Sequence, residues 1–522
     1  MMKFLWLFSI LLAGLLPGRR ALHIFQQNRY EPGRQISWLK ENLHLIIAKS
    51  GDRTALILIS CVAGVLLKDP ANRIVQIVLC LLLGGLMYAS EKQQKYIKPL
   101  VFTARVKRQI AVMLVLGALV LAVLYLFDLK LLSVLTAAVG PWLLVFPMFW
   151  ITEPIEASVR NWYKNQAKKI LADMNSLIKI GITGSYGKTS TKNIMQAMIS
   201  ERYKSLMTPA SYNTPMGITR TIREELKPIH QVFVCEMGAD HVGDITELME
   251  FVKPTIGVVT SIGPQHLNTF GSQENIIKEK MQEIELLPAD GLGILNYDND
   301  FIRQYRVKNN VKTVSYGIRH TEADYVARDI VYTPTGSSFT VVNNGEEHRI
   351  ETKLLGELNI LNILSAIAAA RYLQVDWRTI ARAAKAMKQV EHRLELKKIN
   401  GFRFIDDAFN ANPAGSAMAL EVLSMMPNTR CIVTPGMIDL GEKQDEINRA
   451  FGAKMNDKAD LVILVGVQQT KPIYEGLKES GFAMDHVLVV DKVKEAFAYV
   501  YSHLTPQDTI LLENDLPDAF NH

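Results

Sequence analysis

The stretch Gly181-Ile182-Thr183-Gly184-Ser185-Tyr186-Gly187-Lys188-Thr189-Ser190 is a glycine-rich turn that ends in Gly-Lys-Thr. An apolar run at 177–182, which predicts a strand, precedes it, and an amphipathic segment at 191–199, which predicts a helix, follows it. Such a turn points backbone N–H groups and a helix N-terminus at one place, which suits a polyphosphate. We therefore expect phosphate contacts from Thr183, Gly184, Ser185, Gly187, Lys188, Thr189 and Ser190.

Two positions in the turn have more specific expected roles. Lys188 is placed to reach the outer phosphates, and the hydroxyl of Thr189 or Ser190 to ligate Mg²⁺. The general pattern has a glycine where this chain has Ile182, so the turn is the shorter T-G-x-x-G-K-T form. The alternative is a turn that merely joins a strand to a helix, and the placement of the lysine and threonine favours phosphate binding over it.

The composition indicates several domains of different character. The 522 residues suffice for three or four domains. Hydrophobic residues make up 48% of the chain, and they are concentrated in the first 150 positions. The net charge is +6, but the excess of Lys and Arg clusters around the apolar runs. We interpret it as charge that flanks membrane segments, and we expect no nucleic-acid partner.

Five apolar runs occupy residues 4–16, 54–67, 74–89, 110–127 and 131–150. The last two approach the length needed to cross about 30 Å of hydrocarbon. The loops after the first and third runs are rich in Lys and Arg, and those after the second and fourth are poor. This alternation predicts five spans with the N-terminus outside. Because the loop after the first run is so basic, a retained anchor is favoured over a cleaved signal peptide.

The sequence therefore predicts a multi-pass protein of a bacterial-type cell membrane that contacts membrane lipid, with its catalytic domains in the cytoplasm. The basic segment at 160–173 predicts a connecting helix along the membrane face. After it, short apolar runs alternate with helical periodicity to about residue 385, as in α/β domains.

Polar residues follow the predicted strands at 231–235 and 255–260. Ligands of open α/β sheets gather at the carboxyl ends of strands. Glu236 comes directly after the first strand and is placed to hold Mg²⁺ or orient a nucleophile. His266 lies shortly after the second, and we favour a site role over a structural one for it. A third strand is predicted at 293–295.

Other polar positions are less specific. An amphipathic helix at 275–287 carries Lys278 and Lys280 among acids, a pattern that by itself indicates charge pairs on a solvated face. A β-rich block at 325–350 predicts a small insertion. Asn359 and Asn362 lie on one side of a helix start, which suits either a cap or contact with a base.

The last part of the chain again alternates strands and helices, with strands predicted at 402–405, 430–434 and 461–465. Polar clusters occur at 391–395 and 406–413. An Asp at the end of a strand can bind ribose hydroxyls, and a nearby Arg can stabilise a transferred phosphate. The alternative for both clusters is a solvated loop.

Nine motifs follow one another in this order: TGSYGKTS at 183–190, SYNTPMG at 211–217, EMGAD at 236–240, HLNTFGS at 266–272, the lysine helix near 280, GELNILN at 356–362, EHRLE at 391–395, DDAFNANP at 406–413 and PGMIDLG at 435–441. Together they resemble the Mur ligase family, ATP-dependent enzymes that join a carboxylate to an amino acid or peptide through an acyl-phosphate. The resemblance covers residues 177–522. Several motifs are most similar to the branch that adds D-alanyl-D-alanine to a muramyl tripeptide.

The resemblance implies an α/β fold with a P-loop central ATPase domain and a C-terminal Rossmann-like domain, and the apolar runs predict an N-terminal α-helical transmembrane domain before them. With the composition, it predicts a membrane domain at 1–155, a connecting helix at 156–176, the central domain at 177–385 and the C-terminal domain at 386–522. The soluble first domain that binds the UDP-sugar in the peptidoglycan ligases is replaced here by the apolar runs, so the residues that recognise UDP are absent or moved.

The resemblance also implies site roles. ATP and Mg²⁺ are the expected cofactors, with Asn359 on the adenine, Arg393 on the phosphates and Asp407 on the ribose. Lys280 takes the place of the family's carbamylated lysine, whose added carboxylate helps to hold a second Mg²⁺. The metal ligands implied are Thr189, Glu236, His266 and carbamylated Lys280. The catalytic residues implied are Lys188, Glu236, His266 and Lys280.

The leading functional hypothesis is an ADP-forming amide ligase that adds an amino acid or a dipeptide such as D-Ala-D-Ala to a carboxylate-bearing cell-wall precursor or polymer at the membrane. Membrane partner subunits are possible under this hypothesis. One alternative is a poly-γ-glutamate-type synthase. Another is a membrane transport or assembly ATPase, but the apolar runs offer no polar translocation path.

Overall fold

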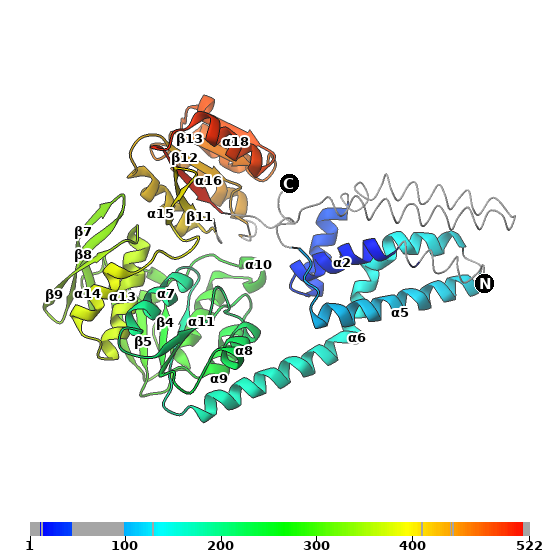
Figure 1. Cartoon of the computed structure of the whole chain (residues 1–522), viewed down its shortest axis with the longest axis horizontal. Helices are drawn as coiled ribbons and strands as arrows, with labels where there is room; N and C mark the ends of the chain where they lie inside the picture. Colours follow the sequence, from blue (N-terminus) through cyan, green and yellow to red (C-terminus); the bar gives the residue numbers. More distant parts are fainter. Residues whose placement is uncertain are drawn as a thin grey trace. The chain divides into compact units, whose positions relative to one another are not determined.

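The computed structural model describes residues 11, 14–43, 99–127, 130–408, 411–438, 440 and 443–514, without the side chains of residues 16, 130–138 and 268 (Figure 1). The chain divides into two units, which meet in the sequence between Asn161 and Trp162. The first unit is helical in its described part, and the second contains two β-sheets flanked by helices.

The N-terminal unit contains helices α2 (Leu15–Gln27), α5 (Ala104–Leu126) and most of α6 (Lys130–Asp173). Its core is apolar and aromatic: Phe25 of α2 and Met148 of α6 are fully buried in one cluster. The Arg108 guanidinium donates two hydrogen bonds, of 2.7 and 2.8 Å, to the carboxylate of Glu156. This bidentate pair joins α5 to α6.

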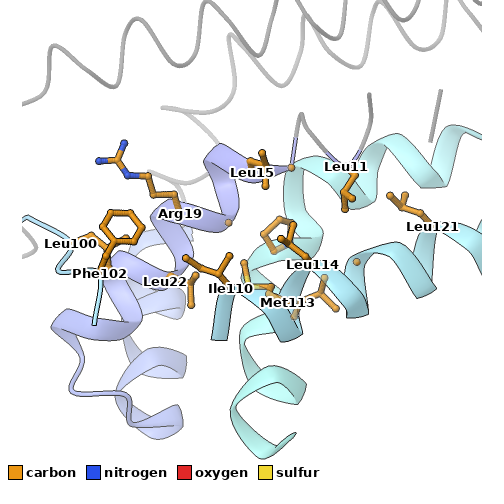
Figure 2. A pocket seen from close by; sticks show the side chains of 15 residues that line it. Leu11, Leu15, Arg19, Leu22, Leu100, Phe102, Ile110, Met113, Leu114 and Leu121 are labelled. Carbon is orange, nitrogen blue, oxygen red and sulfur yellow. The ribbon is translucent and has the colours of Figure 1, made fainter. Parts of the chain in front are cut away.

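An apolar cavity of about 170 Å³ lies among α2, α5 and α6 (Figure 2). Glycines on these helices help to leave the space open: a Cβ atom on Gly18 would stand 2.9 Å from the Met113 side chain. Of the side chains drawn in Figure 2, Arg19 is the one that carries a charge.

The structure describes fewer candidate spans than the five predicted from the sequence. The runs at 54–67 and 74–89 lie outside the described residues, and the run at 4–16 lies largely outside them. Among the described residues, one helix, α5, is long and apolar enough to cross a membrane, which is weak evidence of a span. The run at 131–150 forms the first turns of α6, and its Trp142 and Val145 are buried against α2. These two buried residues pack within the unit.

The second unit begins with a nine-stranded sheet in the order β2-β3-β1-β4-β5-β6-β7-β8-β9. Strands β2 to β7 pair in parallel along this order, and β7, β8 and β9 form an antiparallel meander at one edge. The strands are β1 (Ile178–Thr183), β2 (Ser205–Met207), β3 (Val232–Glu236), β4 (Ile256–Val259), β5 (Leu292–Asn296), β6 (Lys312–Gly317), β7 (Tyr325–Thr333), β8 (Gly336–Asn343) and β9 (Glu346–Thr352).

Helices cover both faces of this sheet (Figure 1). Ile180 and Val234 point to the face covered by α7, α13 and α14, and Phe233 and Cys235 point to the face covered by α8, α9 and α11. The alternation along each strand follows from the two-residue period of side chains. The helices are α7 (Lys188–Ile199), α8 (Pro215–Glu224), α9 (Asp244–Val252), α10 (Leu267–Phe270), α11 (Gln273–Glu285), α12 (Asp300–Arg303), α13 (Glu357–Tyr372) and α14 (Trp377–Ala386).

A row of glycines lets α11 approach the sheet closely. Gly181, Gly257 and Gly293 are register partners on the adjacent strands β1, β4 and β5. A Cβ atom on Gly181 would stand 1.9 Å from the Glu283 carboxylate, and one on Gly257 would stand 2.8 Å from the Glu283 carbonyl oxygen. The backbone of α11 therefore takes the room that side chains would fill.

The second sheet has six strands in the order β10-β11-β15-β12-β13-β14, of which β10 is antiparallel and the others parallel. Its strands are β10 (Glu395–Ile399), β11 (Phe402–Asp407), β12 (Arg430–Thr434), β13 (Leu461–Val465), β14 (Val487–Val490) and β15 (Thr509–Glu513). Helices α15 (Pro413–Ser424), α16 (Gln444–Lys454), α17 (Lys471–Glu479) and α18 (Val493–His503) accompany it.

The segment at 160–173 does not form a separate helix along a membrane face, as the sequence predicted. It is the end of α6, and its Ala167 and Leu171 are buried in the cluster that α8 and α9 also form. Lys164 pairs with Glu247 of α9 at 2.5 Å. The sequence showed the basic surface of this helix but not its partner.

The α/β prediction for the remainder is confirmed. The strands expected at 177–182, 231–235, 255–260 and 293–295 are β1, β3, β4 and β5, and the expected β insertion contains β7, β8 and β9. The strands expected at 402–405, 430–434 and 461–465 are β11, β12 and β13. The domain bounds at 177–385 and 386–522 stay a prediction.

Replacing Gly181 by Ala is expected to destabilise the nine-stranded sheet by about 1–3 kcal/mol, because the new methyl group overlaps the Glu283 carboxylate. The free energy of unfolding is measured in urea, with alkylation of buried Cys235 on the neighbouring strand as the signal of unfolding. Gly33→Ala is the control, since Gly33 is helical and nothing lies within 4 Å of the position that its methyl group would take. Equal midpoints for the two variants would contradict the argument.

Candidate active site

Two glycines give the loop between β1 and α7 its shape. Gly184 has φ 148° and Gly187 has φ 84°, conformations that residues with a Cβ atom rarely adopt. A Cβ atom on Gly184 would also stand 2.1 Å from the Thr260 hydroxyl. Gly187 is the N-cap of α7. The N–H groups in the first turn of a helix have no partner within the helix, so those of α7 point toward the loop.

The loop is braced by the segment that follows β4. The Ser185 amide donates to the Ser261 carbonyl at 2.7 Å, and the Tyr186 amide donates to the Ser261 hydroxyl at 3.0 Å. The Ser185 hydroxyl donates to the Gly263 carbonyl at 3.1 Å. At the start of the loop, the Thr183 hydroxyl donates to the Met237 carbonyl at 3.0 Å. Ser185 and Thr183 thus support the loop through their side chains.

The Lys188 ammonium group folds back over the loop. It donates to the carbonyl oxygens of Gly184, at 2.6 Å, and Ser185, at 3.2 Å. Burial lowers the pKa of Lys188 to about 8; Glu236 opposes this shift and Arg393 adds to it.

Glu236 lies at the end of β3 beside the loop, as the sequence predicted, and its carboxylate is almost fully buried. Its Oε1 atom accepts hydrogen bonds from the Thr189 hydroxyl at 3.1 Å and the Asn213 amide at 3.0 Å. Its Oε2 atom pairs with the Lys192 ammonium group at 3.0 Å. Of the two hydroxyls considered for Mg²⁺, the structure places that of Thr189 on this carboxylate, while Ser190 is buried within α7.

His266 lies at the start of α10 with φ 55°, and its Nε2 atom is 3.1 Å from the Asp240 carboxylate. Asp240 belongs to the EMGAD stretch that begins with Glu236. The structure thus brings the two predicted segments together through this pair. Within the part of the chain that the structure describes, no three His, Cys, Asp or Glu side chains form a metal-binding group.

Lys280 is buried on α11, whereas its helix pattern indicated a solvated face. Its ammonium group donates to the Ala239 carbonyl at 3.2 Å and lies 5.7 Å from the centre of the Phe270 ring. Burial lowers the pKa of Lys280 well below its usual value, and the nearby Lys188 adds to the effect. The carboxylates that oppose the shift are Glu279, Asp244 and Glu283.

Asn359 and Asn362 are both buried in the first turns of α13. The Asn359 amide donates to the Leu355 carbonyl at 2.9 Å, so this side chain bonds to backbone next to its own helix. The Asn362 side chain is the one next to the loop: its oxygen accepts from the Thr191 hydroxyl at 3.0 Å and leaves no room for a Cβ atom on Gly187. The sequence pattern pointed to the pair, and the structure puts Asn362 closer to the phosphate loop.

Arg393 lies just before β10, and Asp407 is the last residue of the neighbouring strand β11. Burial lowers the pKa of Arg393, and Asp407, Glu236 and Glu513 oppose this. Burial raises the pKa of Asp407 to about 6, while Arg393 and a 3.1 Å hydrogen bond from the Leu394 amide lower it. Glu513, the register partner of Asp407 on β15, was not expected from the sequence.

A cavity of about 710 Å³ opens beside Thr189. It is lined by α7, by Ala210 and Ser211, and by the segment that leads from α14 to Arg393. Small-molecule sites commonly measure about 300–1,000 Å³.

Two residues next to Glu236 were missed from the sequence. Lys192 lies three residues after Thr189 on the same helix, a spacing that places both on one face of α7. Asn213 lies in the SYNTPMG stretch, which the sequence marked without assigning a role to any residue. The sequence around each residue could have marked it, but it could not show that both residues contact Glu236 on β3.

Two protein-family models match the chain. The Mur ligase middle domain matches residues 182–370, and the Mur ligase glutamate ligase domain matches residues 392–513. The described part of the N-terminal unit precedes both matches.

Curated relatives named UDP-N-acetylmuramoyl-tripeptide–D-alanyl-D-alanine ligase are similar to this chain. The Bacillus subtilis protein is 28% identical over 351 residues, which are 66% of this chain and 75% of the relative. The Escherichia coli protein is 29% identical over 292 residues, 55% of this chain and 64% of the relative. The Mycobacterium tuberculosis H37Rv protein is 30% identical over 361 residues, 64% of this chain and 69% of the relative.

Solved structures share the fold. The chain aligns with MurF from Acinetobacter baumannii with a TM-score of 0.62 at 24% identity, over 70% of this chain and 78% of the other. It aligns with MurF ligase from Thermotoga maritima, solved in complex with ADP, with a TM-score of 0.61 at 22% identity, over 69% and 81%.

These findings contradict the predicted location of the protein. The relatives are peptide-precursor ligases of the MurF type, and among the described residues a single helix is a candidate span. The prediction of a multi-pass membrane protein is therefore wrong. It read the apolar runs at 110–127 and 131–150 as spans, whereas buried residues of both contribute to packing within the N-terminal unit.

The glycine loop, the carboxylate beside it and the order of the motifs agree with the two family models, which together reach from β1 to β15. A relative at 30% identity is covered over 69% of its own length. The chain belongs to the Mur ligase family of ATP-dependent, ADP-forming acid–amino-acid ligases.

Proposed function

We propose that this protein adds D-alanyl-D-alanine to the carboxyl group of a UDP-N-acetylmuramoyl-tripeptide. The observation that carries the proposal is the phosphate loop, whose Thr189 hydroxyl lies 3.1 Å from the buried Glu236 carboxylate. The name of the relatives supplies the two substrates. These relatives are ligases, and nothing among them supports a poly-γ-glutamate synthase or a transport ATPase.

The reaction has two chemical steps. The substrate carboxylate attacks the γ-phosphorus of ATP, so that an acyl-phosphate forms and ADP leaves. The amine of the dipeptide then attacks the acyl carbon, the amide bond forms, phosphate leaves and the amine loses a proton. In the proposal, the glycine loop and Lys188 stabilise charge on the transferred phosphoryl group, with Arg393 on the phosphates and Asp407 on the ribose. Asn359 or its neighbour Asn362 would contact the adenine.

The side chains around Glu236 fit a magnesium ion. A threonine hydroxyl and a carboxylate are oxygen donors of the kind Mg²⁺ prefers, and Mg²⁺ usually takes one or two protein oxygens together with phosphates and water. Thr189 and Glu236 would hold the ion, which would neutralise charge on the nucleotide phosphates. The proposed metal ligands also include His266, which is paired with Asp240.

Lys280 fits the role of a carbamylated lysine. An amine must be uncharged to react with CO₂, and burial favours the uncharged form of Lys280 by lowering its pKa. The added carboxylate would supply oxygen donors for a second Mg²⁺. The division into a central domain at 177–385 and a C-terminal domain at 386–522 also belongs to this proposal.

The purified full-length chain, supplied with ATP and Mg²⁺, is expected to release ADP and phosphate when UDP-N-acetylmuramoyl-tripeptide and D-Ala-D-Ala are both present. Omission of either substrate is expected to abolish the release, because the acyl-phosphate needs the acid and its turnover needs the amine. L-Ala-L-Ala is the matched control for the dipeptide. Release that continues without acid and amine would overturn the ligase assignment.

The affinity for ADP is expected to fall as pH rises through about 8, the pKa of Lys188, because this residue loses the charge that attracts the phosphates. One linked proton limits the fall to about tenfold per pH unit. Calorimetric titration between about pH 7 and 9.5 measures it. The variant Lys188→Arg stays charged over this range and should show a flat profile. If the ADP affinity of the parent does not change with pH, the proposed contact of Lys188 with the phosphates is wrong.

Lys280→Ala is expected to lower the turnover rate by about 100-fold or more, because a charged group at the reaction centre is lost. Acetate or propionate is expected to restore part of the rate by entering the space of the carbamate. The control is Lys278→Ala on the exposed side of the same helix. If the Lys280 variant keeps the parent's phosphate-release rate, the carbamate role is wrong.

A further inference from the structure

The Glu236 carboxylate is held from two sides by residues of other elements. Its Oε1 atom accepts hydrogen bonds from Thr189 and Asn213, and its Oε2 atom pairs with Lys192. The side chains of Lys192 and Glu236 are 0% and 1% exposed. The carboxylate therefore has one orientation, fixed by contacts on both oxygens.

Lys192 also contacts a third element. Its ammonium group donates to the Ala210 carbonyl in the loop between β2 and α8. Ala210 has φ 43°, a conformation that persists in a residue with a Cβ atom only where its surroundings hold it. In the same loop, the Asn213 carbonyl accepts from the Gly238 amide at 2.8 Å. Lys192 thus joins the helix of the phosphate loop, the end of β3 and the loop that lines the 710 Å³ cavity.

Stability alone is a poor explanation for this pair. The cost of taking two charges out of water commonly matches or exceeds their attraction, and apolar residues of similar volume often serve a fold equally well. The pair instead lies on the carboxylate that the phosphate-loop threonine touches. Groups that hold a metal-binding carboxylate in place tune the metal affinity of that carboxylate.

The contacts of Lys192 and Thr189 fall on different oxygens of Glu236. Lys192 pairs with Oε2, while Thr189 and Asn213 donate to Oε1. The Oε1 atom thereby stays turned toward the phosphate loop.

We propose that Lys192, together with Asn213, is a positioning residue that holds Glu236 so that its Oε1 atom faces the divalent cation of the bound nucleotide. The inference rests on the proposed function and deepens it, because it names the residues that set metal affinity at this site. It makes no use of the identity of the acid or the amine.

The test measures ADP binding to the full chain by calorimetry, once with MgCl₂ and once with EDTA. The ratio of the two affinities reports the metal contribution separately from the nucleotide contribution. Lys192→Met is expected to reduce this ratio by about 10–100-fold, the usual effect of losing a group that supports a metal ligand. Its affinity for ADP in EDTA is expected to stay within about twofold of the parent, since the Lys192 ammonium group donates to Ala210 and Glu236 of the protein itself.

Three further variants complete the test. Lys192→Arg keeps the charge and is expected to restore most of the ratio. Lys204→Met makes the same chemical change at an exposed lysine in the same sheet region and is expected to leave the ratio unchanged. Because Lys192→Met leaves Glu236 buried without its cation, that variant can fail to fold. Asn213→Ala leaves no bare charge and then carries the test, with an expected reduction of about tenfold.

An unchanged or larger ratio in a folded Lys192→Met variant, or in Asn213→Ala where the first does not fold, would overturn the proposal and leave the proposed function intact. A parent chain whose ADP affinity does not depend on Mg²⁺ would contradict the proposed function itself. The two failures are therefore distinguishable in one set of titrations.

Discussion

The contacts of the buried Glu236 carboxylate are the constraint on which the candidate site depends. Through this one group, β3 is tied to α7 by Thr189 and Lys192 and to the loop before α8 by Asn213. A buried carboxylate without partners would be costly or would take up a proton. Three donors contact its two oxygens, and the oxygen that faces the phosphate loop keeps one position.

The glycine row on β1, β4 and β5 has a similar importance on the other side of the sheet. Gly181 and Gly257 leave room for the backbone of α11, which brings this helix close beneath the strands. Lys280 lies on the same helix, so the close packing also determines how deeply its amine is buried. The site therefore depends on residues that carry no functional group at all.

Burial acts on the charged groups of the site in one direction. It lowers the pKa of Lys188 and Lys280 and raises that of Asp407, which brings each group nearer to its uncharged form. The bound phosphates of the proposed reaction would reverse this for Lys188, because opposite charges favour the ionised form. Electrostatic stabilisation among such buried groups is stronger than in water, which suits phosphoryl transfer.

Much of this could be predicted from the sequence, because strands, turns and phosphate loops are local patterns. Gly184, Gly187, Lys188 and the carboxylate after β3 were all recognisable within a few residues of each other or of a strand end. The helix pattern around Lys280, by contrast, indicated a solvated face, and the family resemblance alone suggested a site. The apolar runs at 110–127 and 131–150 were predicted to be spans because hydropathy does not show that some of their residues, such as Leu121 and Trp142, are buried within the protein.

The sequence by itself determined the phosphate loop, the α/β alternation and the order of the motifs, since these depend on short-range spacing. The tertiary structure alone decided that Lys192 and Asn213 meet at Glu236, that Lys280 is buried and that α6 ends on α8 and α9. The physical reason is the strand order β2-β3-β1-β4. It brings together side chains that are distant in the chain, and no local period or propensity encodes that order.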